Sequence, residues 1–383
     1  MGDAGAPGGA AAGHRLLVFG FDAAEAAQRR RIKAYMTCGF DVQGFTMRRA
    51  NMTHDVQCFW PNVDLGETRN AAMVQRVWRI LASMPILLRN RRKLTGAETI
   101  VARNLDMLIV AAFARVLARG RPRMVYEALD IHDMMTAAGP KGRLARWVER
   151  RLLSRTDAIV VSSPAFVQAY FVPVQGWNGP VRLVENKLWL DTGGPARPLL
   201  EDRPADAPLR LGWVGTLRCP QSFDILIRTA DRLGDRIRLD LHGIVHQHML
   251  PDFETVIAAR PTVTYHGPYA YPDGLEAIYR SCDAVWVQDL WQWSTNSAWL
   301  LPNRIYEAGY FGCPSIAVAG TETGRRVAQG LGWTVPEPSA EALATLLDGL
   351  TRADLNAKRS ALLAMPDSLF LQSSEEITEA VLP

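Results

Sequence analysis

The chain has 383 residues, 48% of them hydrophobic and 21% charged, and carries a formal net charge of +4. This length favours two domains, and a composition without any apolar run of the roughly 18 residues that a membrane span needs predicts a soluble globular protein. Residues 1–187 hold 27 Lys and Arg against 15 Asp and Glu, and the remainder holds 16 against 24, so we expect an anionic surface or substrate, but no nucleic acid, to meet the N-terminal half.

Predicted strands and helices alternate along the N-terminal half. Residues 1–13, rich in Gly, Ala and Pro, predict a disordered tail and not a signal peptide. Strands are predicted at 15–20, 40–46, 98–102, 124–127, 158–162 and 181–185, and helices at 23–37, 70–93, 105–119 and 142–153. This alternation predicts an α/β domain over residues 14–190, with a parallel sheet covered on both faces.

A second alternating half follows residues 191–208, whose Pro, Gly and Asp content predicts a linker. Strands are predicted at 209–214, 238–242, 263–265, 284–287 and 315–318, and helices at 222–233, 252–259, 274–281, from 302, at 340–350 and at 353–365. We assign the second domain to 209–365 and expect 366–383 to return to the first domain. Two doubly wound, Rossmann-like domains of this kind bind ligands in the cleft that the carboxyl ends of their strands face.

An arginine and a glutamate stand near the start of the helix predicted from Pro302. Proline suits the first helical position because its missing N–H has no partner there. Arg304 and Glu307 are three residues apart and lie on one side of the helix. The helix start attracts anions, and a carboxylate beside it can accept hydrogen bonds from ribose hydroxyls. The segment predicts a nucleotide-sugar clamp; the alternative is an amphipathic helix with a surface ion pair.

The sequence GWVGTLR at 212–218 ends one predicted strand and precedes a helix. Gly215 allows a sharp turn and a close approach of the backbone to a ligand, and the guanidinium group of Arg218 suits phosphate oxygens. Thr216, beside the turn, and Asn303, beside Arg304, complete the candidate donor-binding residues. The alternative is a tight turn that carries a solvated arginine.

Three acidic residues and one histidine are candidates for catalysis in the first domain. Asp130, His132 and Asp133 follow the strand predicted at 124–127, so their side chains are expected at the ligand-binding edge. Asp130 or Asp133 could act as general base on an acceptor hydroxyl, and His132 could contact the donor sugar. Asp22, which also follows a strand, is a rival base. The alternative is a loop whose aspartate caps the next helix.

Two further patterns invite functional readings. His242, His246 and His248 suggest a metal site, but without a nearby Cys or acidic cluster the pattern is weak for zinc. The five cysteines are far apart and form no Cys-x-x-Cys pair, so we expect neither a zinc site nor a disulfide framework, and a reducing cytoplasm as the compartment. Residues 73–93 mix apolar and basic side chains, which favours either a helix lying on an anionic membrane or a core-packed helix with a solvated basic end.

Together these motifs resemble the two-domain GT-B glycosyltransferases of family 4. The resemblance is carried by GWVGTLR at 212–218, NRIYEAGYFGCPSIAV at 303–318 and DIHD at 130–133. SSPAF at 162–166 and VENKL at 184–188 are similar to exopolysaccharide-assembly members of the family.

The resemblance implies roles for several of the candidate residues. Gly215 and Arg218 would hold the donor diphosphate, and Arg304 would also face phosphate. Glu307 would bind the nucleotide ribose, and His132 would touch the donor sugar. The resemblance also implies catalysis without a divalent metal.

One position departs from the pattern of this family. Trp299 stands where the first glutamate of the E-x7-E element is expected. Contacts to the donor-sugar hydroxyls therefore need another group, and retention or inversion of the anomeric configuration stays open.

We therefore expect a glycosyltransferase that uses a nucleotide-sugar as substrate and needs no cofactor. A polyprenyl-diphosphate-linked sugar at the inner membrane is the expected acceptor. The alternatives are a nucleotide-sugar epimerase of the same fold and a non-catalytic nucleotide-sugar sensor. A Rossmann dehydrogenase is disfavoured because neither 18–26 nor 212–220 contains GxGxxG.

Overall fold

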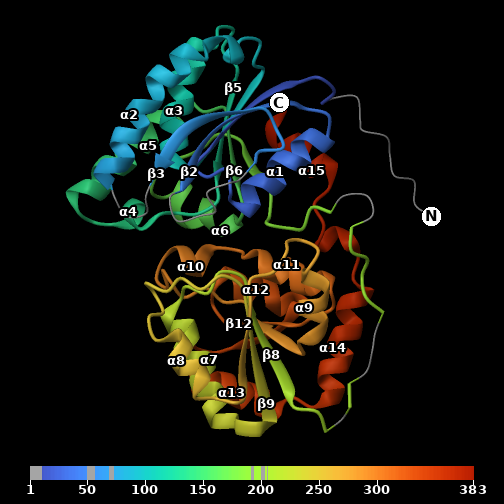
Figure 1. The fold of residues 1–383 in the computed structure, drawn as a ribbon. Coiled ribbons are helices and arrows are strands. Elements are labelled where there is room, and N and C mark those ends of the chain that lie inside the picture. The colour runs from blue at the N-terminus through green and yellow to red at the C-terminus, as the bar shows by residue number, and fades with distance from the viewer. Residues whose placement is uncertain (1–10, 50–56, 69–72, 191–193, 200–202, 205) are drawn as a thin grey trace. The chain divides into compact units, whose positions relative to one another are not determined.

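The computed structural model describes residues 11–49, 57–68, 73–190, 194–199, 203–204 and 206–383. The chain divides into two compact units, Met1–Glu185 with Ser373–Pro383, and Asn186–Gln372 (Figure 1). Each unit is built on one parallel sheet with helices on both faces. The predicted fold class, two doubly wound parallel-sheet α/β domains, is confirmed.

The described part of the first unit contains a seven-stranded sheet of order β3-β2-β1-β4-β5-β6-β7, with every neighbouring pair parallel. Its strands are β1 (Arg15–Gly20), β2 (Asp41–Arg49), β3 (Asn62–Thr68), β4 (Thr99–Arg103), β5 (Arg123–Ala128), β6 (Ala158–Val161) and β7 (Val181–Leu183). All five side chains of β4 are buried. A central strand covered on both faces explains why the residues between Thr99 and Arg103 are all apolar.

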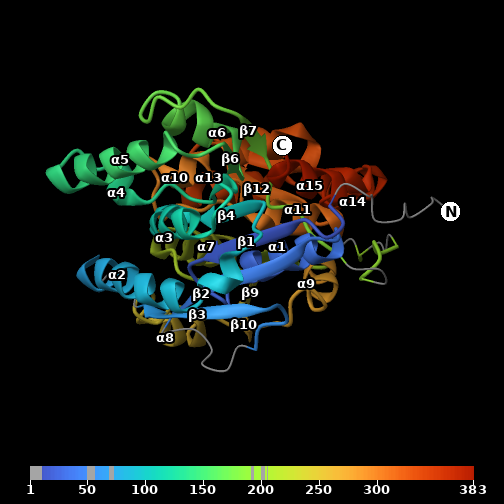
Figure 2. The same cartoon turned by 90° about the horizontal axis from the view of Figure 1, so that it is seen from above.

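Helices cover both faces of this sheet. They are α1 (Ala26–Thr37), α2 (Met73–Arg89), α3 (Asn104–Leu117), α4 (Asp133–Thr136), α5 (Pro140–Leu153), α6 (Pro164–Phe166) and α15 (Ser374–Val381), with helical turns at Arg91–Leu94 and Val167–Phe171. Figures 1 and 2 show α2, α3 and α5 on one side of the sheet and α1 with α15 on the other. The C-terminal helix therefore belongs to the first unit.

The second unit has a six-stranded parallel sheet of order β10-β9-β8-β11-β12-β13 among its described residues. Its strands are β8 (Leu209–Val214), β9 (Ile237–His242), β10 (Val263–Gly267), β11 (Ala284–Trp286), β12 (Ser315–Val318) and β13 (Gly332–Val335). Its helices are α7 (Pro220–Leu233), α8 (Phe253–Ala258), α9 (Leu275–Ser281), α10 (Asn296–Trp299), α11 (Asn303–Tyr310), α12 (Glu322–Arg326), α13 (Ala340–Gly349) and α14 (Arg352–Ala364), with helical turns at Gly234–Arg236, Val327–Leu331 and Asp367–Leu369.

Alternate residues of β8 supply two hydrophobic cores in this unit. Leu211 and Trp213 belong to a core that includes side chains of α7, α8 and α13. Val214 belongs to the other core, which includes side chains of α9 and α11. The period of two that places successive side chains on opposite faces makes β8 the central element of the second unit.

The boundary between the units differs from the predicted one. Asn186 donates from its side chain to the carbonyl of Leu301 (3.1 Å), and the backbone of Leu188 pairs with Phe370 and Gln372. These contacts explain why the first unit ends at Glu185 and not at residue 190. The described residues of the expected linker 191–208, and residues 366–372, fall within the second unit.

Two sequence expectations concern segments at the limits of the described chain. Residues 1–10 of the expected tail lie outside the described residues, whereas residues 11–13 are ordered, with Ala11 buried and the amide of Gly13 donating to the carbonyl of Gly39 (3.0 Å). Residues 70–72 of the expected helix also lie outside that range. Among the described helices, none has both the length and the apolar character needed to cross a bilayer.

Candidate functional site

A glycine turn follows β8 at the point where the strand order of the second unit reverses. Open α/β sheets bind ligands at such switch points, beyond the carboxyl ends of the strands. Gly215 has φ +114°, a conformation that residues with a Cβ rarely adopt. Its carbonyl also lies so near Gly243 that a Cβ on Gly243 would be 1.7 Å from that oxygen. The turns after β8 and β9 therefore lie in close contact, and each has a glycine at the point of contact.

The start of α11 is held beside this turn by Arg304. Its Nη1 donates to the carbonyl of Val214, the last residue of β8, at 3.2 Å. Pro302 is the N-cap, with an extended backbone (φ −74°, ψ 148°), and not the first helical residue as we predicted. Since the first N–H groups of a helix lack intrahelical partners, this contact brings a set of anion-attracting donors to the Gly215 turn.

Arg218 lies at the same edge of the sheet, near the residues that follow β11. Its side chain is half exposed, and its Nη2 lies 4.0 Å from Oδ2 of Asp289. Asp289 is fixed in turn, because its Oδ1 accepts hydrogen bonds from Ser297 Oγ (2.6 Å) and the amide of Trp291 (2.8 Å). Arg218 and Arg304 are thus both tied to the carboxyl edge of this sheet, while Thr216 is exposed beside the turn.

Glu307 lies deeper in α11 and contacts a tyrosine. It is buried, and Tyr279 donates from its hydroxyl to Glu307 Oε2 at 3.0 Å. Burial, and next the Glu307 carboxylate, raise the pKa of Tyr279 and of Tyr269, so both phenols stay protonated and can donate. Asn303, the first residue of the helix, is half-buried.

Trp299, the residue that departs from the family pattern, ends α10 and is half-buried. It brings no carboxylate to the site. Asp289, which sequence analysis missed, does bring one. The available signal was an acidic residue two positions beyond a predicted strand.

In the first unit the strand order reverses between β1 and β4. Asp22 follows β1, is almost fully buried, and accepts from the amide of Ala24 through Oδ1 (3.0 Å). Burial raises the pKa of Asp22. Its second oxygen lies 3.9 Å from Nε of Arg49. At this switch point, one oxygen of the Asp22 carboxylate is therefore already hydrogen-bonded, and the other is not held by a close partner of the described chain.

A buried ion network that sequence analysis missed lies beside Asp22. Glu127, at the end of β5, pairs through Oε2 with Arg103 Nε (2.9 Å) and through Oε1 with Arg31 Nε (3.0 Å). These two arginines hold the pKa of Glu127 below its ordinary value although burial opposes them. Glu25, 3.6 Å from Arg103, has its pKa raised by burial, with smaller contributions from Asp130 and Asp22. The charges of Asp22 and Asp130 thus both disfavour ionisation of this glutamate.

His132 and Asp133 open the short helix α4. The Nδ1 of His132 accepts from the amide of Met134 at 3.3 Å, so the helix cap that we assigned to an aspartate, in the alternative reading, is this histidine. Asp133 is the first helical residue and is exposed, as is Asp130. Desolvation, followed by the charge of Arg76, lowers the pKa of His132, which favours the neutral imidazole.

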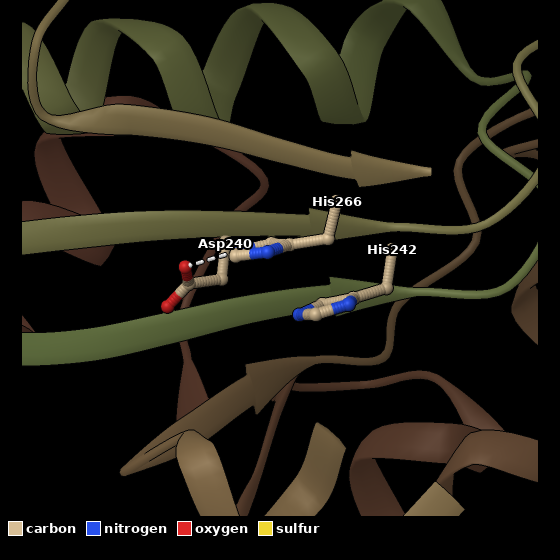
Figure 3. Close-up of side chains that lie close together, drawn as sticks. All are labelled: Asp240, His242 and His266. Carbon is tan, nitrogen blue, oxygen red and sulfur yellow. Dashed lines mark hydrogen bonds and ion pairs between the residues drawn. The ribbon is translucent and has the colours of Figure 1, made fainter. Parts of the chain in front are cut away.

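The structure does not assemble the three histidines that suggested a metal site. The ring of His242 stacks on that of His266, with centroids 4.3 Å apart, beside Asp240 (Figure 3). His246 and His248 instead lie near each other, with ring centroids 5.5 Å apart. The cluster that could hold a metal is therefore a different one from the one that the sequence suggested.

Comparison with known proteins shows the family. Residues 6–187 match the family described as "Glycosyl transferase 4-like domain". Over 346 residues the chain is 33% identical to "Succinoglycan biosynthesis protein ExoL" of Rhizobium meliloti (strain 1021), which covers 88% of this chain and 85% of that protein.

Solved structures share the fold across nearly the whole chain. A sucrose-phosphate synthase from Thermosynechococcus elongatus has a TM-score of 0.70 at 16% identity, covering 95% of this chain and 96% of its own. HepE of Anabaena, in complex with UDP and glucose, has a TM-score of 0.67 at 16% identity. The match covers 96% of this chain and 98% of the HepE chain. At these identities the likeness concerns the fold.

Proposed function

Because the chain belongs to the glycosyl transferase 4-like family and is a glycosyltransferase, we propose that it moves a sugar from a nucleotide-sugar donor to a saccharide acceptor during exopolysaccharide assembly. The similarity to a protein of succinoglycan biosynthesis supports exopolysaccharide assembly as the process. The UDP and glucose bound to HepE support a donor of this chemical class.

The observation that carries the proposal is the hydrogen bond from Arg304 to Val214. It joins the start of α11 to the end of β8, so that the guanidinium group of Arg304 and the helix start lie beside the Gly215 turn. A diphosphate needs this combination of a close backbone approach and convergent positive charge. A helix can pack on a sheet in this way without binding an anion. The guanidinium group beside the open glycine turn favours an anion-binding role.

In the proposed reaction the donor diphosphate lies on Arg218, Arg304 and the N-terminus of α11. Negative charge builds on the leaving phosphate as the bond to the sugar breaks. Fixed positive groups stabilise that charge without reorganising, which is usually the largest catalytic contribution. Glu307 would accept hydrogen bonds from the ribose, with Tyr279 holding its carboxylate in place. We propose that this chemistry requires no divalent metal.

Asp289 would take the place of the carboxylate that Trp299 does not supply. Its Oδ1 is held by Ser297 and Trp291, whereas the contact of its Oδ2 within the described part of the chain is the long one to Arg218 (4.0 Å). A carboxylate oxygen oriented in this way can accept hydrogen bonds from the hydroxyls of the donor sugar.

The first unit would bind the acceptor. Asp130 is the favoured general base, because it is exposed at the end of β5 whereas Asp22 is buried and committed to the Ala24 amide. Asp133 is the second choice, since it stands in the first turn of α4. His132, kept neutral, would donate to or accept from a sugar hydroxyl.

We further propose that α2 lies on an anionic membrane that carries a polyprenyl-diphosphate-linked acceptor, at the cytoplasmic face of the inner membrane. Val77, Trp78 and Leu81 are 52%, 67% and 52% exposed, and Leu88 is 47% exposed. They fall on one face because the helix turns by about 100° per residue. The exposed Arg89 and the turn Arg91–Leu94 place basic groups beside this face. Tryptophan and arginine together suit a lipid–water interface.

Donor binding tests the proposed site. Thermal stabilisation by a panel of UDP-, GDP- and ADP-sugars should single out one nucleotide, because a ligand that binds the folded state raises the melting temperature. Arg304→Gln should remove most of that shift, and Arg218→Gln should reduce it. Arg228→Gln, an exposed arginine on α7 (63% exposed), is the matched control and should keep the full shift. Equal shifts in all three variants would refute the site.

A further inference from the structure

A cavity of about 380 Å³ opens in the second unit beside the first residues of β8 and β9. Its polar and charged lining consists of Arg203, Arg210, Arg238, Asp240, Thr264 and His266. A pocket of this size lies within the range of small-molecule sites. None of these residues belongs to the glycine turn, to α11 or to the loop after β11.

These side chains share one face of the sheet because of the strand register. Arg210 pairs with Arg238, and Asp240 with Thr264, across β8, β9 and β10. The register shifts between Tyr265 and Gly267, so His266 is the extra residue of a bulge. Bulges re-aim a side chain, and this one brings His266 Nε2 to 2.7 Å from Asp240 Oδ1.

The charge of this lining favours an anion. The lining contains three guanidinium groups and one carboxylate, that of Asp240, and a second carboxylate outside the lining, that of Asp283, pairs with Arg203. Arg210 donates from Nε to Asp240 Oδ2 (2.9 Å), which leaves its terminal nitrogens available for a further acceptor. Within the described residues, Arg238 contacts backbone carbonyls and the exposed carboxylate of Asp235 (3.4 Å), a weak surface pair. Arg203 is the most committed, since it pairs with the buried Asp283 (3.2 Å).

A metal ion fits the same residues less well. The oxygens of Asp240 are already occupied by Arg210 and His266. The rings of His242 and His266 are parallel to within 6° and stacked, as Figure 3 shows, so the in-plane lone pairs of the two rings do not converge on one point. Guanidinium groups beside the cluster would also repel a cation. Two observations favour a metal: the ligand atoms of the three side chains lie within 4.8 Å of one another, and the buried Nε2 of His242 has no hydrogen-bond partner among the described residues. The ring geometry and the neighbouring guanidinium groups outweigh them.

We propose that this cavity is a second anion site, separate from the glycine turn, for a small molecule that carries a phosphate or diphosphate group. Arg238 and Arg210 would donate to the phosphate oxygens, and the Thr264 hydroxyl would add a neutral donor. Planar guanidinium groups bind phosphate in this paired manner. Strand β9 runs from this cavity to His242, whose carbonyl accepts from the amide of Gly215 (2.9 Å). The proposal does not depend on the transfer reaction.

Calorimetric titration of the full chain with inorganic pyrophosphate tests the proposal. The titration uses Arg304→Gln as background, so that the donor turn does not contribute. We expect one binding event, weakened about tenfold or more by Arg238→Glu, because a charge-assisted hydrogen bond contributes roughly 1.5–3 kcal/mol. Thr264→Asp, which adds a negative charge and removes no ion pair, should weaken it as well. A parallel titration with UDP distinguishes a nucleotide from the free inorganic anion as the source of the phosphate.

Matched controls make the result decisive. Arg228→Glu and Thr345→Asp change exposed residues of α7 and α13 in the same ways, and should leave pyrophosphate binding within twofold. Absence of binding in the Arg304→Gln background, or equal weakening by the controls, would overturn the proposal. So would binding of Zn²⁺ that Asp240→Asn abolishes and Arg238→Glu leaves unchanged. Since the readout is binding, failure of the transfer assay would leave this result intact.

Discussion

Asp289, which follows β11, is the side chain that we propose to contact the donor sugar. Asp289 presents its Oδ2 toward Arg218, and Ser297 holds the other oxygen at 2.6 Å. We predict that Asp289→Asn lowers the transfer rate about tenfold or more, because a hydrogen bond to a charged group contributes roughly 1.5–3 kcal/mol. Steady-state rates at saturating donor measure this loss.

The control for this prediction is Asp224→Asn, a change of the same kind at an exposed residue of α7. It should leave the rate unchanged. Wild-type rates for Asp289→Asn would show that another group replaces the missing glutamate. A parallel loss of melting temperature would instead indicate that Asp289 serves only to hold the loop.

At the residue scale, sequence analysis identified groups whose neighbours are local. Arg304 and Glu307 were placed together because their spacing along one helix requires it. Arg103 and Glu127 were missed as a pair because their contact depends on β4 lying beside β5. Strand order is a long-range property, and a single sequence carries little information about it.

At the scale of elements, the proposed membrane contact of α2 and of the turn Arg91–Leu94 can be tested directly. Replacing Arg91, Arg92 and Lys93 by glutamine should reduce binding to anionic vesicles about tenfold or more, since each basic residue near such a surface contributes about 1 kcal/mol. Co-sedimentation with vesicles that contain an anionic phospholipid measures the bound fraction. Binding should also weaken as salt is added.

Three exposed arginines of the second unit provide the control. Arg228, Arg232 and Arg236 are 63%, 54% and 62% exposed, and their replacement by glutamine removes the same charge. If both triple variants bind equally, net charge and not α2 is responsible. Trp78→Ser removes the most exposed of the described apolar side chains of α2. It should weaken binding if α2 lies on the membrane and should leave binding unchanged if net charge is responsible.

Elements with a buried apolar run were predicted well, and of the four edge strands β7 and β10 were predicted whereas β3 and β13 were missed. β3 was missed because an edge strand with only two buried side chains, Val63 and Leu65, lacks an apolar pattern. The expected first helix, 23–37, begins later, at Ala26. In the structure the preceding residues form a turn, in which the amide of Ala24 donates to Asp22.

For the whole molecule, the distribution of charge follows the division into units. The basic excess lies in residues 1–187, nearly the same residues as the first unit apart from its C-terminal helix. An acceptor that carries a diphosphate would be attracted to that unit, and the donor would be held by a few arginines in an otherwise acidic one. The expectation that the two units face one cleft stays a prediction.

The remaining alternatives differ in what they do with the donor. An epimerase would convert the donor without any acceptor. A sensor would bind the donor and release no nucleotide. A transferase releases nucleotide when acceptor is present and, because water is excluded when the site closes, little in its absence.

The most direct measurement is nucleotide release from the identified donor, with and without polyprenyl-diphosphate-linked saccharide, in the presence of EDTA. We predict release that depends on acceptor, persists in EDTA and is unchanged in Arg228→Gln. Release should fall about tenfold or more in Arg304→Gln, because one charge-assisted contact to the leaving phosphate contributes roughly 1.5–3 kcal/mol. Release independent of acceptor, or Arg304→Gln activity equal to that of the wild type, would contradict the account.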